Sequence, residues 1–352
     1  MRRLAAEDFF ETLGDRARAA RIPEGLTFEL SYGCNLRCVH CYNPTHRALP
    51  RELTTAEVCA ILEQCAELGV ASVCFSGGEP LVRPDALRIF EHAKRLGLLV
   101  DLISNATRVT PEIADRLALL GFRNLAVSIY GATRATYERV TRRPGSWEQF
   151  RSGLECLVSR GLPLTVRMPV MTDNAHEVGD ARALVVDLGL KFQYCLDIAP
   201  KSDGDPSPLL HRLSPAEKLR IDREQRGQDD GGMDEAACAA SDEFISCACG
   251  RTRFAITPYG EMNLCVAFPM PRYDLRTGTV RAGWEVLKQT VDRARPNERY
   301  ECPRCPVRGR CRQGPSDAWL ATGDMSVCLP HFKAWATLET DLHERDCLRC
   351  AD

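Results

Sequence analysis

Short apolar runs alternate with helix-forming segments along the first two thirds of the chain. We predict six strands from these runs, at Thr27–Ser31, Ser72–Phe75, Leu99–Ser104, Asn124–Ile129, Leu164–Val170 and Phe192–Ile198. Helical segments fall between the strands, and strands that alternate with helices in this way run parallel, with the helices outside them. The pattern therefore predicts an α/β fold built on a parallel sheet.

Start and stop signals delimit several of the predicted helices. Thr54 and Glu57 are spaced as a capping box, and Gly69 ends the helix that they begin. Thr110, which precedes a proline, begins another helix that ends at Gly121. Six strand–helix units are too few for a closed eight-fold barrel, so we expect an open, partial (β/α)6 TIM-like barrel. Parallel barrels carry their chemistry at the carboxyl ends of the strands.

The pattern changes after a stretch rich in glycine and aspartate at 226–240, which we interpret as a linker. Beyond it the predicted strands shorten, turns multiply and cysteines become frequent. We predict three parts, namely an N-terminal helical lead at 1–24, the barrel at 25–230 and a cysteine-rich domain at 231–352. The last part looks too small for a strong apolar core, and bound metal clusters would supply the missing cross-links.

Charge and hydropathy narrow the class of protein. The 352 residues include 46 basic and 48 acidic ones, which gives a net charge of −2 and no basic field of the kind that binds nucleic acid. No apolar run is long enough to span a bilayer, and the first 14 residues have the pattern of an amphipathic helix rather than of a signal peptide. We expect a cytoplasmic protein that binds neither nucleic acid nor membranes.

The 18 cysteines are far more than an ordinary chain of this length carries. They cluster at 34–41, 247–265, 302–311 and 328–350. Without a secretion signal, such clusters favour metal binding or redox chemistry over disulfides.

The first cluster has the spacing C-x3-C-x2-C and directly follows the first predicted strand. Its members are Cys34, Cys38 and Cys41. Three thiolates on one tight loop can bind three corners of a [4Fe–4S] cube and leave the fourth iron open to a substrate or cofactor. The alternative is a zinc site in which His40 serves as the fourth ligand.

This loop resembles the cluster loop of the radical S-adenosylmethionine superfamily, and the ends of the next strands agree with it. Gly77-Gly78-Glu79-Pro80 resembles the family's GGEP motif. Arg139 resembles the arginine that pairs with the methionine carboxylate, since a guanidinium fits a carboxylate bidentately. In full, the resemblance implies cofactor-binding roles for His40, Gly77, Gly78, Glu79, Pro80, Ser104, Asn105, Ser128 and Arg139.

The resemblance also implies the chemistry. Cys34, Cys38 and Cys41 would hold a catalytic [4Fe–4S] cluster, and S-adenosylmethionine would chelate its open iron. Reductive cleavage would then release a 5′-deoxyadenosyl radical that abstracts hydrogen from a substrate, while the protein binds, orients and excludes water. A flavodoxin- or ferredoxin-type protein would donate the electron.

The later cysteines resemble the SPASM extension, which holds auxiliary iron–sulfur clusters in many radical enzymes that modify peptides. The matching spacings are C-x10-G-x4-C and C-x2-C-x5-C. The resemblance implies one or two auxiliary [4Fe–4S] clusters. The outer one would be bound by Cys302, Cys305, Cys311 and Cys328, and the inner one by Cys249 and Cys265, with Cys247 as a further ligand.

One position departs from the SPASM pattern. The family has a cysteine four residues after Cys311, where this chain has Pro315. Either the inner cluster has an open iron, or Cys347 or Cys350 replaces the missing ligand. The alternative to the clusters is a zinc ribbon of four thiolates, from Cys302, Cys305, Cys347 and Cys350.

The substrate class is inferred from what relatives with the SPASM extension modify. Relatives with this extension mostly modify peptides, and others act on sugars or haem precursors. We expect an oxidoreductase that matures a ribosomally synthesised precursor peptide, through a thioether or carbon–carbon crosslink or another modification. Sulfatase maturation fits less well, because Val266 stands where those enzymes have an aspartate.

Roughly 26 residues precede the first strand, too few for a leader-binding winged helix. A peptide would then need a separate leader-binding protein, or would be bound by the barrel itself. The alternative is a radical dehydrogenase or epimerase that acts on a small molecule such as a sugar or antibiotic intermediate. A third reading, a metal-binding scaffold without catalysis, predicts that no 5′-deoxyadenosine is formed.

Overall fold

One sheet of nine strands runs through the residues that the computed structural model describes, which are 14–226 and 243–349. The strand order is β6-β5-β4-β3-β2-β1-β7-β8-β9. The strands are β1 Gly25–Ser31, β2 Ser72–Gly77, β3 Leu99–Ser104, β4 Asn124–Ser128, β5 Leu164–Pro169, β6 Lys191–Cys195, β7 Arg253–Ile256, β8 Glu261–Asn263 and β9 Tyr273–Asp274. The helix predicted for the first 14 residues and the linker predicted at 226–240 lie outside the described residues, apart from Gly14 and Arg226.

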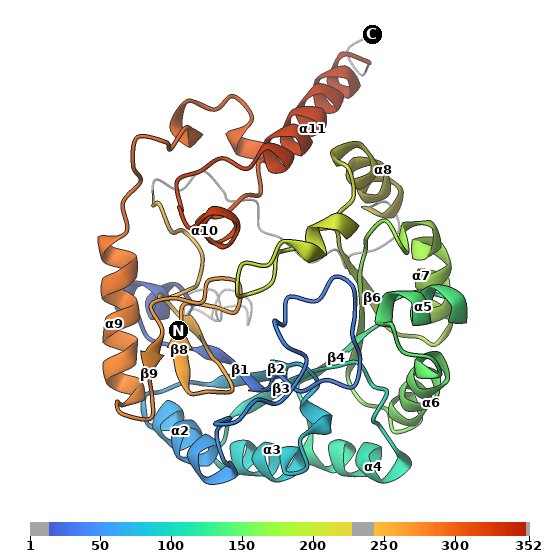
Figure 1. Ribbon diagram of the computed structural model, residues 1–352, viewed down its shortest axis with the longest axis vertical. Helices are drawn as coiled ribbons and strands as arrows, with labels where there is room; N and C mark the ends of the chain where they lie inside the picture. Colours follow the sequence, from blue (N-terminus) through green and yellow to red (C-terminus); the bar gives the residue numbers. More distant parts are fainter. Residues whose placement is uncertain (1–13, 227–242, 350–352) are drawn as a thin grey trace, which may run out of the picture.

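Strands β1 to β6 are parallel, and each pairs with the next along the chain. Helices form an arc outside them, which confirms the predicted partial barrel (Figure 1). The helices are α2 Thr55–Glu67, α3 Ala86–Arg95, α4 Pro111–Leu120, α5 Arg134–Thr141, α6 Ser146–Val158, α7 Val178–Asp187, α8 Pro215–Arg226, α9 Val280–Arg293, α10 Pro315–Thr322 and α11 Pro330–Arg349.

The predicted caps set the helix ends. The Glu57 carboxylate accepts a hydrogen bond from the backbone of Thr54 at 2.7 Å, and the Thr54 hydroxyl accepts one from the backbone of Glu57 at 3.3 Å. Helix α4 begins after Thr110 and ends at Gly121, whose φ of 61° is left-handed. Glycine adopts this conformation without the strain that a side chain would add.

The apolar core lies between the strands and the outer helices. Phe28 of β1, Phe75 of β2 and Phe90 of α3 are fully buried. Their rings form a continuous row, with centroids 6.4 Å apart for Phe28 and Phe75 and 4.9 Å apart for Phe75 and Phe90. Each such side chain contributes about 1.5–3 kcal/mol by its burial, so the row fixes the sheet against its helices.

The opposite face of the strands is polar at their carboxyl ends. Neighbouring residues of a strand point to opposite sides of the sheet, so Glu29 faces away from the core that holds Phe28 and lines a pocket in the barrel interior. Ser76 of β2 and Ser128 of β4 line another interior pocket, the one that also holds the first cysteine loop. The fold therefore gathers hydrophilic groups at the edge where parallel barrels carry chemistry.

The cysteine-rich region joins the barrel through β7, which pairs in parallel with β1 and not with β6. Leu26 lies opposite Phe254, and Phe28 lies opposite Ile256. Strands β8 and β9 continue the sheet in antiparallel fashion. The sheet is thus continuous across the boundary predicted at residue 230, and Cys265, just beyond β8, lies close to the barrel interior.

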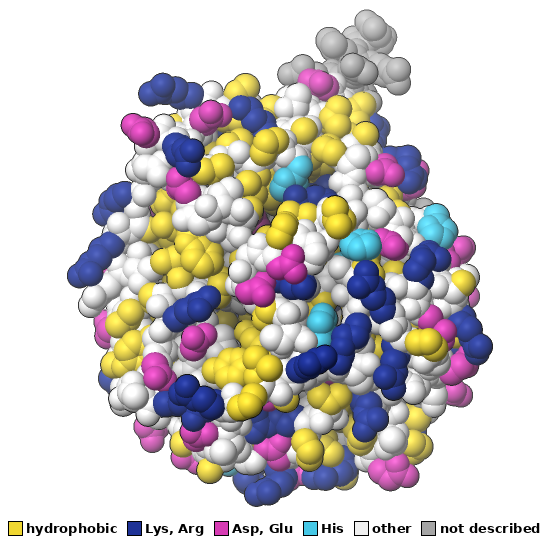
Figure 2. Space-filling view, in the orientation of Figure 1, with side chains coloured by type: hydrophobic (Ala, Val, Ile, Leu, Met, Phe, Trp, Pro, Cys, Tyr) yellow, Lys and Arg dark blue, Asp and Glu magenta, His cyan; other side chains and the backbone are white. Residues whose placement is uncertain are grey.

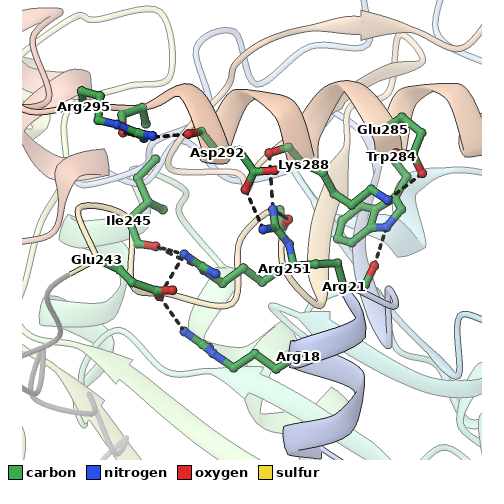
Figure 3. Close-up of polar contacts among 12 residues, drawn as sticks. Arg18, Arg21, Glu243, Ile245, Arg251, Trp284, Glu285, Lys288, Asp292 and Arg295 are labelled. Atoms are coloured by element: carbon green, nitrogen blue, oxygen red, sulfur yellow. Dashed lines mark hydrogen bonds and ion pairs between the residues drawn. The ribbon is translucent and has the colours of Figure 1, made fainter.

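Polar contacts fasten the N-terminal segment to the same region (Figure 3). The Arg21 guanidinium pairs with Asp292 of α9 at 2.7 Å. The backbone carbonyl of Arg21 accepts a hydrogen bond from the indole of Trp284 at 2.9 Å. Arg18 and Arg251 both approach the carboxylate of Glu243. These contacts hold the residues before β1 against α9 and the loop that precedes β7.

Helix α11 packs on α8 at the other end of the sheet. Trp335 is fully buried, and its ring centroid lies 4.7 Å from both the Lys218 ammonium and the Arg312 guanidinium carbon. Basic and acidic side chains are interspersed over the face drawn in Figure 2. Among the described residues, no helix has the length and apolar character needed to cross a membrane.

Candidate active site

The three cysteines of the first cluster lie in one pocket at the carboxyl ends of the barrel strands. Their loop directly follows β1, and backbone hydrogen bonds from Arg37 and Val39 to the end of α5 hold it in place, at 2.9 and 3.0 Å. The structure brings most of the predicted cofactor residues to the same pocket. Its lining includes Cys34, Cys38, His40, Cys41, Gly77, Gly78, Ser104, Asn105 and Ser128.

Burial makes the three thiols poor acids. It raises the pKa of Cys34 to about 12 and that of Cys41 to about 11, and it raises the pKa of Cys38 well above its ordinary value. The neighbouring thiols add to the effect at Cys34 and Cys38, because several negative charges repel in a pocket with little water. Binding of cationic iron would therefore displace protons from this loop.

Among the described residues, no three His, Cys, Asp or Glu side chains are grouped closely enough to hold a single metal ion. The thiolates of a four-iron cube each bind a different iron atom, so they stand farther apart than the ligands of one zinc ion. Cys34, Cys38 and Cys41 line one pocket, as the ligands of a single cube must.

The two glycines of the GGEP-like motif allow the loop after β2 to lie directly on the cysteine loop. Gly77 has a φ of 121°, and a Cβ atom there would lie 2.4 Å from the Ser31 carbonyl oxygen. A Cβ on Gly78 would lie 2.3 Å from the Gly33 carbonyl oxygen. Instead, the Gly78 amide donates to the Ser31 carbonyl at 2.7 Å. Only glycine allows this approach.

Replacing Gly78 by alanine is therefore expected to disrupt the pocket. The added methyl group meets backbone atoms that cannot rotate away, so the two loops must separate. We expect iron content after anaerobic reconstitution, and affinity for S-adenosylmethionine, each to fall by about tenfold or more, which corresponds to at least about 1.4 kcal/mol of lost binding.

Gly179→Ala is the matched control for Gly78→Ala. Gly179 lies in α7 with an ordinary φ and nothing within 4 Å of a built Cβ, so its substitution should leave iron content and affinity unchanged. Equal iron content and equal affinity in the two variants would contradict the structural role assigned to Gly78.

Glu79 supports the pocket from behind. Its buried carboxylate accepts a hydrogen bond from the Ser104 hydroxyl at 2.9 Å. It also accepts hydrogen bonds from the backbone amides of Asn105 at 2.7 Å and Leu81 at 3.1 Å. Burial raises the pKa of Glu79, and these three donors oppose that rise. Neither Glu79 nor Pro80 is among the lining residues, so in this structure Glu79 positions the end of β3.

His40 presents an unsatisfied polar atom to the pocket. Its ring centroid lies 5.4 Å from that of Tyr130, and its Nδ1 atom is buried without a hydrogen-bond partner. Burial lowers the pKa of His40 to about 4, so the imidazole is neutral near pH 7. Buried polar atoms normally have partners, and a bound ligand would supply one. The Nδ1 atom of His46, in the same pocket, is also without a partner.

The structure does not bring Arg139 to this pocket. The side chain is exposed on α5, where its guanidinium donates to the Asp173 carbonyl at 2.7 Å and to the Thr136 hydroxyl at 3.1 Å. The lining residues include no arginine or lysine. The pairing of Arg139 with a carboxylate stays a prediction.

The four cysteines predicted for the outer cluster line one cavity. Cys302 begins a short 3-10 turn, and Cys305 and Cys311 each directly follow one. Cys328 lies two residues before α11. Burial raises the pKa values of Cys311 and Cys328, and the other thiols of the set raise them further. Four soft sulfur donors around one cavity form a ligand set that suits an iron–sulfur cluster. The set is Cys302, Cys305, Cys311 and Cys328.

The cysteines predicted for the inner cluster are also neighbours. The thiol of Cys249 interacts with those of Cys247 and Cys265. The hydrogen bond between Cys247 and Cys249 lowers the pKa of Cys247 and raises that of Cys249. Pro315, which stands at the position of the expected further ligand, lines the outer cavity.

The C-terminal helix separates Cys347 from the outer cysteines. Cys347 lies 17 residues after Pro330 in α11, a distance of about 25 Å along the helix axis at 1.5 Å per residue. Cys328 lies at the opposite end, and Cys350 is outside the described residues. The structure therefore groups Cys302 and Cys305 with Cys311 and Cys328 rather than with the end of α11.

A partial barrel whose first loop carries three cysteines, covered by a Gly-Gly loop, is the architecture of a radical S-adenosylmethionine enzyme. Residues 28–185 match the family model described as Radical SAM superfamily. This match lies in the barrel and covers a little under half of the chain, so the barrel is a domain of the radical S-adenosylmethionine type. Members of that superfamily use a [4Fe–4S] cluster and S-adenosylmethionine.

Two relatives in sequence differ in how much of this chain they match. The chain is 29% identical over 329 residues to AdoMet-dependent heme synthase of Methanosarcina barkeri, covering 86% of this chain and 94% of that enzyme. It is 35% identical over 172 residues to PqqA peptide cyclase of Streptomyces rochei, covering 49% of this chain and 47% of that enzyme. The match to the cyclase thus spans about half of its length.

Solved structures share the whole fold. SuiB of Streptococcus suis, bound to precursor peptide SuiA, matches 90% of this chain and 79% of its own with a TM-score of 0.69 and 16% identity. Native anSMEcpe with bound AdoMet and Cp18Cys peptide matches 90% of this chain and 95% of its own with a TM-score of 0.66 and 16% identity. At such identities the similarity establishes the fold alone.

The residues present fit the family's cofactors. Three thiols share one loop, glycine backbone forms a wall of the same pocket, and His40 offers an unpartnered nitrogen there. Sequence reasoning missed His46, for which no sequence signal exists, and Glu29. The strict alternation of β1, with Phe28 and Leu30 in the core, could have placed Glu29 inside the barrel.

Proposed function

We propose that this protein modifies a ribosomally synthesised precursor peptide by radical chemistry at the Cys34, Cys38 and Cys41 site. When bound, the cluster and S-adenosylmethionine supply a hydrogen-abstracting radical. The observation that carries the proposal is that a hydrogen bond from Tyr42 of this pocket to Glu29 connects it to a second pocket, in the barrel interior beside Cys265. Oxidation of a peptide needs one pocket in which the radical forms and another that holds the substrate beside an auxiliary cluster.

The chain's own residues would hold and enclose the reactants. Leu36, Ile103 and Tyr130 contribute apolar surface to the first pocket, which excludes water from a reactive intermediate. The glycine backbone of the loop after β2 allows close approach of the cofactor. Ser128 and Asn105 offer hydrogen-bonding groups at the ends of β4 and β3.

Two observations support a peptide as the substrate. The chain resembles PqqA peptide cyclases over about half of its length, and 90% of it matches the fold of SuiB, a protein solved with its precursor peptide. The second pocket, in the barrel interior beside Cys265, also offers a place for a peptide side chain. A separate leader-binding protein and a flavodoxin- or ferredoxin-type electron donor complete the proposal.

A haem precursor is the second candidate, because the heme synthase of Methanosarcina barkeri matches both halves of this chain. The charges of the second pocket favour the peptide. Its walls carry three carboxyl groups, from Glu29, Asp203 and Glu261, against the single guanidinium of Arg272. A haem precursor carries carboxylates of its own, which such a pocket would repel.

The test supplies both candidates to the anaerobically reconstituted protein with S-adenosylmethionine and dithionite. We expect the short precursor peptide encoded beside this gene to lose the mass of two hydrogens, because formation of a crosslink removes one hydrogen from each partner. Mass spectrometry measures the change, and Cys38→Ala serves as the inactive control.

Conversion of a haem precursor with no change in the peptide would favour the second candidate. No change in either would exclude both. The proposal requires the peptide alone to change, and only with the wild-type protein.

A further inference from the structure

The second pocket brings a buried carboxyl group, that of Glu29, close to a predicted cluster ligand. It lies between β1, the loop after β6 and the β7–β8 hairpin, and its lining includes Glu29, Tyr32, Asp203, Thr257 and Cys265. It therefore joins the carboxyl end of the first barrel strand to a predicted ligand of the inner cluster.

One hydrogen bond connects the two pockets. Tyr42, which directly follows Cys41 and lines the first pocket, donates its hydroxyl to Oε1 of Glu29 at 2.7 Å. Glu29 in turn lines the second pocket. A substrate in the second pocket would thus contact the Glu29 carboxyl. Only the Tyr42 side chain lies between that carboxyl and the cysteine loop.

Glu29 lacks the partners of a structural carboxylate. It is 3% exposed, and its hydrogen bonds come from two phenols, Tyr42 at 2.7 Å and Tyr32 at 3.4 Å. Among the described residues, no lysine, arginine or histidine forms an ion pair with it. Glu79, the buried carboxylate that positions the end of β3, accepts three hydrogen bonds, two of them from backbone amides. Glu29 accepts none from the backbone of the described segments, so its position beside an open pocket requires another explanation.

We propose that Glu29 is a catalytic residue that takes a proton from the peptide bound in the second pocket. This inference rests on the function proposed above. Burial raises the pKa of Glu29 to about 7, with the two phenol hydrogen bonds acting in the opposite direction. A general base works best when its basicity lies near the working pH, and the geometry places this one at the substrate.

Formation of a crosslink removes one hydrogen atom and one proton from the peptide and leaves one electron. One peptide atom gives up a hydrogen atom, which converts the 5′-deoxyadenosyl group into 5′-deoxyadenosine. The second atom gives up a proton, which the Glu29 carboxylate accepts, as the new bond forms between the two atoms. The electron left over would go to an oxidised iron–sulfur cluster, for which Cys249 and Cys265 are predicted ligands.

The experiment uses Glu29→Gln, which keeps the shape of the side chain and one oxygen acceptor but cannot take the proton. With a perdeuterated precursor peptide, we expect deuterium to enter 5′-deoxyadenosine at close to the wild-type rate. We expect the crosslinked peptide formed per 5′-deoxyadenosine to fall by about 100-fold, within the usual range for loss of a general base. Peptide affinity, measured by fluorescence anisotropy, should change by no more than about twofold.

Two further variants separate catalysis from structure. Glu148→Gln makes the same change on the exposed face of α6, where the side chain pairs with Arg134, and should behave as wild type. Glu29→Asp keeps a carboxylate with shorter reach and should restore part of the crosslinked yield that Glu29→Gln loses.

An unchanged yield of crosslink per 5′-deoxyadenosine in Glu29→Gln would overturn the inference and leave the proposed function standing. Loss of deuterium transfer or of peptide affinity in that variant would also overturn it, since either points to a structural role. A wild-type enzyme that forms no modified peptide would contradict the proposed function and this inference together.

Discussion

Cys38→Ala is expected to lose about four iron atoms per chain relative to wild type, together with all measurable affinity for S-adenosylmethionine. Cys34, Cys38 and Cys41 are the cysteines that line the first pocket, so removing one leaves two corners of the cube with protein ligands. The open iron that would bind the nucleotide is then lost with the cluster. Iron and sulfide analysis, with equilibrium dialysis of labelled S-adenosylmethionine, measures both effects.

Cys156→Ser provides the matched control for Cys38→Ala. Cys156 is a half-buried thiol on α6 that lines none of the pockets described above. Its variant should retain wild-type iron and affinity. Equal iron loss in the two variants, or full iron in Cys38→Ala, would contradict the assignment of the first site.

Cys305→Ser is expected to remove a second, separate share of the iron and to abolish modification of the peptide. The outer cavity and the first pocket share no lining residue. The variant should therefore still form 5′-deoxyadenosine from S-adenosylmethionine when no peptide is present. Iron analysis together with chromatography of 5′-deoxyadenosine and of the peptide distinguishes the two sites.

Cys347→Ser is the control for Cys305→Ser, because α11 carries Cys347 away from the outer cavity. A zinc ribbon predicts the opposite pattern, in which both variants lose one zinc ion and neither loses iron. The clusters assigned to this region require iron loss in Cys305→Ser alone.

The barrel could be predicted from the sequence because its signals are local. The strand at Leu99–Ser104 has the predicted bounds, and the helix after Thr54 begins at the predicted capping box. Apolar runs, caps and terminal glycines each act within a few residues. Strand β7 was not predicted, since it is four residues long and its position depends on pairing with β1, more than 200 residues earlier.

The site shows the same division between local and distant determinants. The spacing of Cys34, Cys38 and Cys41 places them on one loop, and the structure gathers them in one pocket. Arg139 was predicted from its distance along the chain, whereas its side chain direction depends on Asp173, which lies in another loop. The alternation of β1 places Glu29 inside the barrel, whereas the pocket that it lines depends on residues of the distant C-terminal region.

The most direct measurement is the formation of 5′-deoxyadenosine by the anaerobically reconstituted wild-type protein with S-adenosylmethionine and dithionite. Cleavage of one carbon–sulfur bond, at a cluster held by the first cysteine loop, predicts 5′-deoxyadenosine and methionine in equal amounts, and neither product from Cys38→Ala. A wild-type protein that carries an intact four-iron cluster yet leaves S-adenosylmethionine uncleaved would contradict the account.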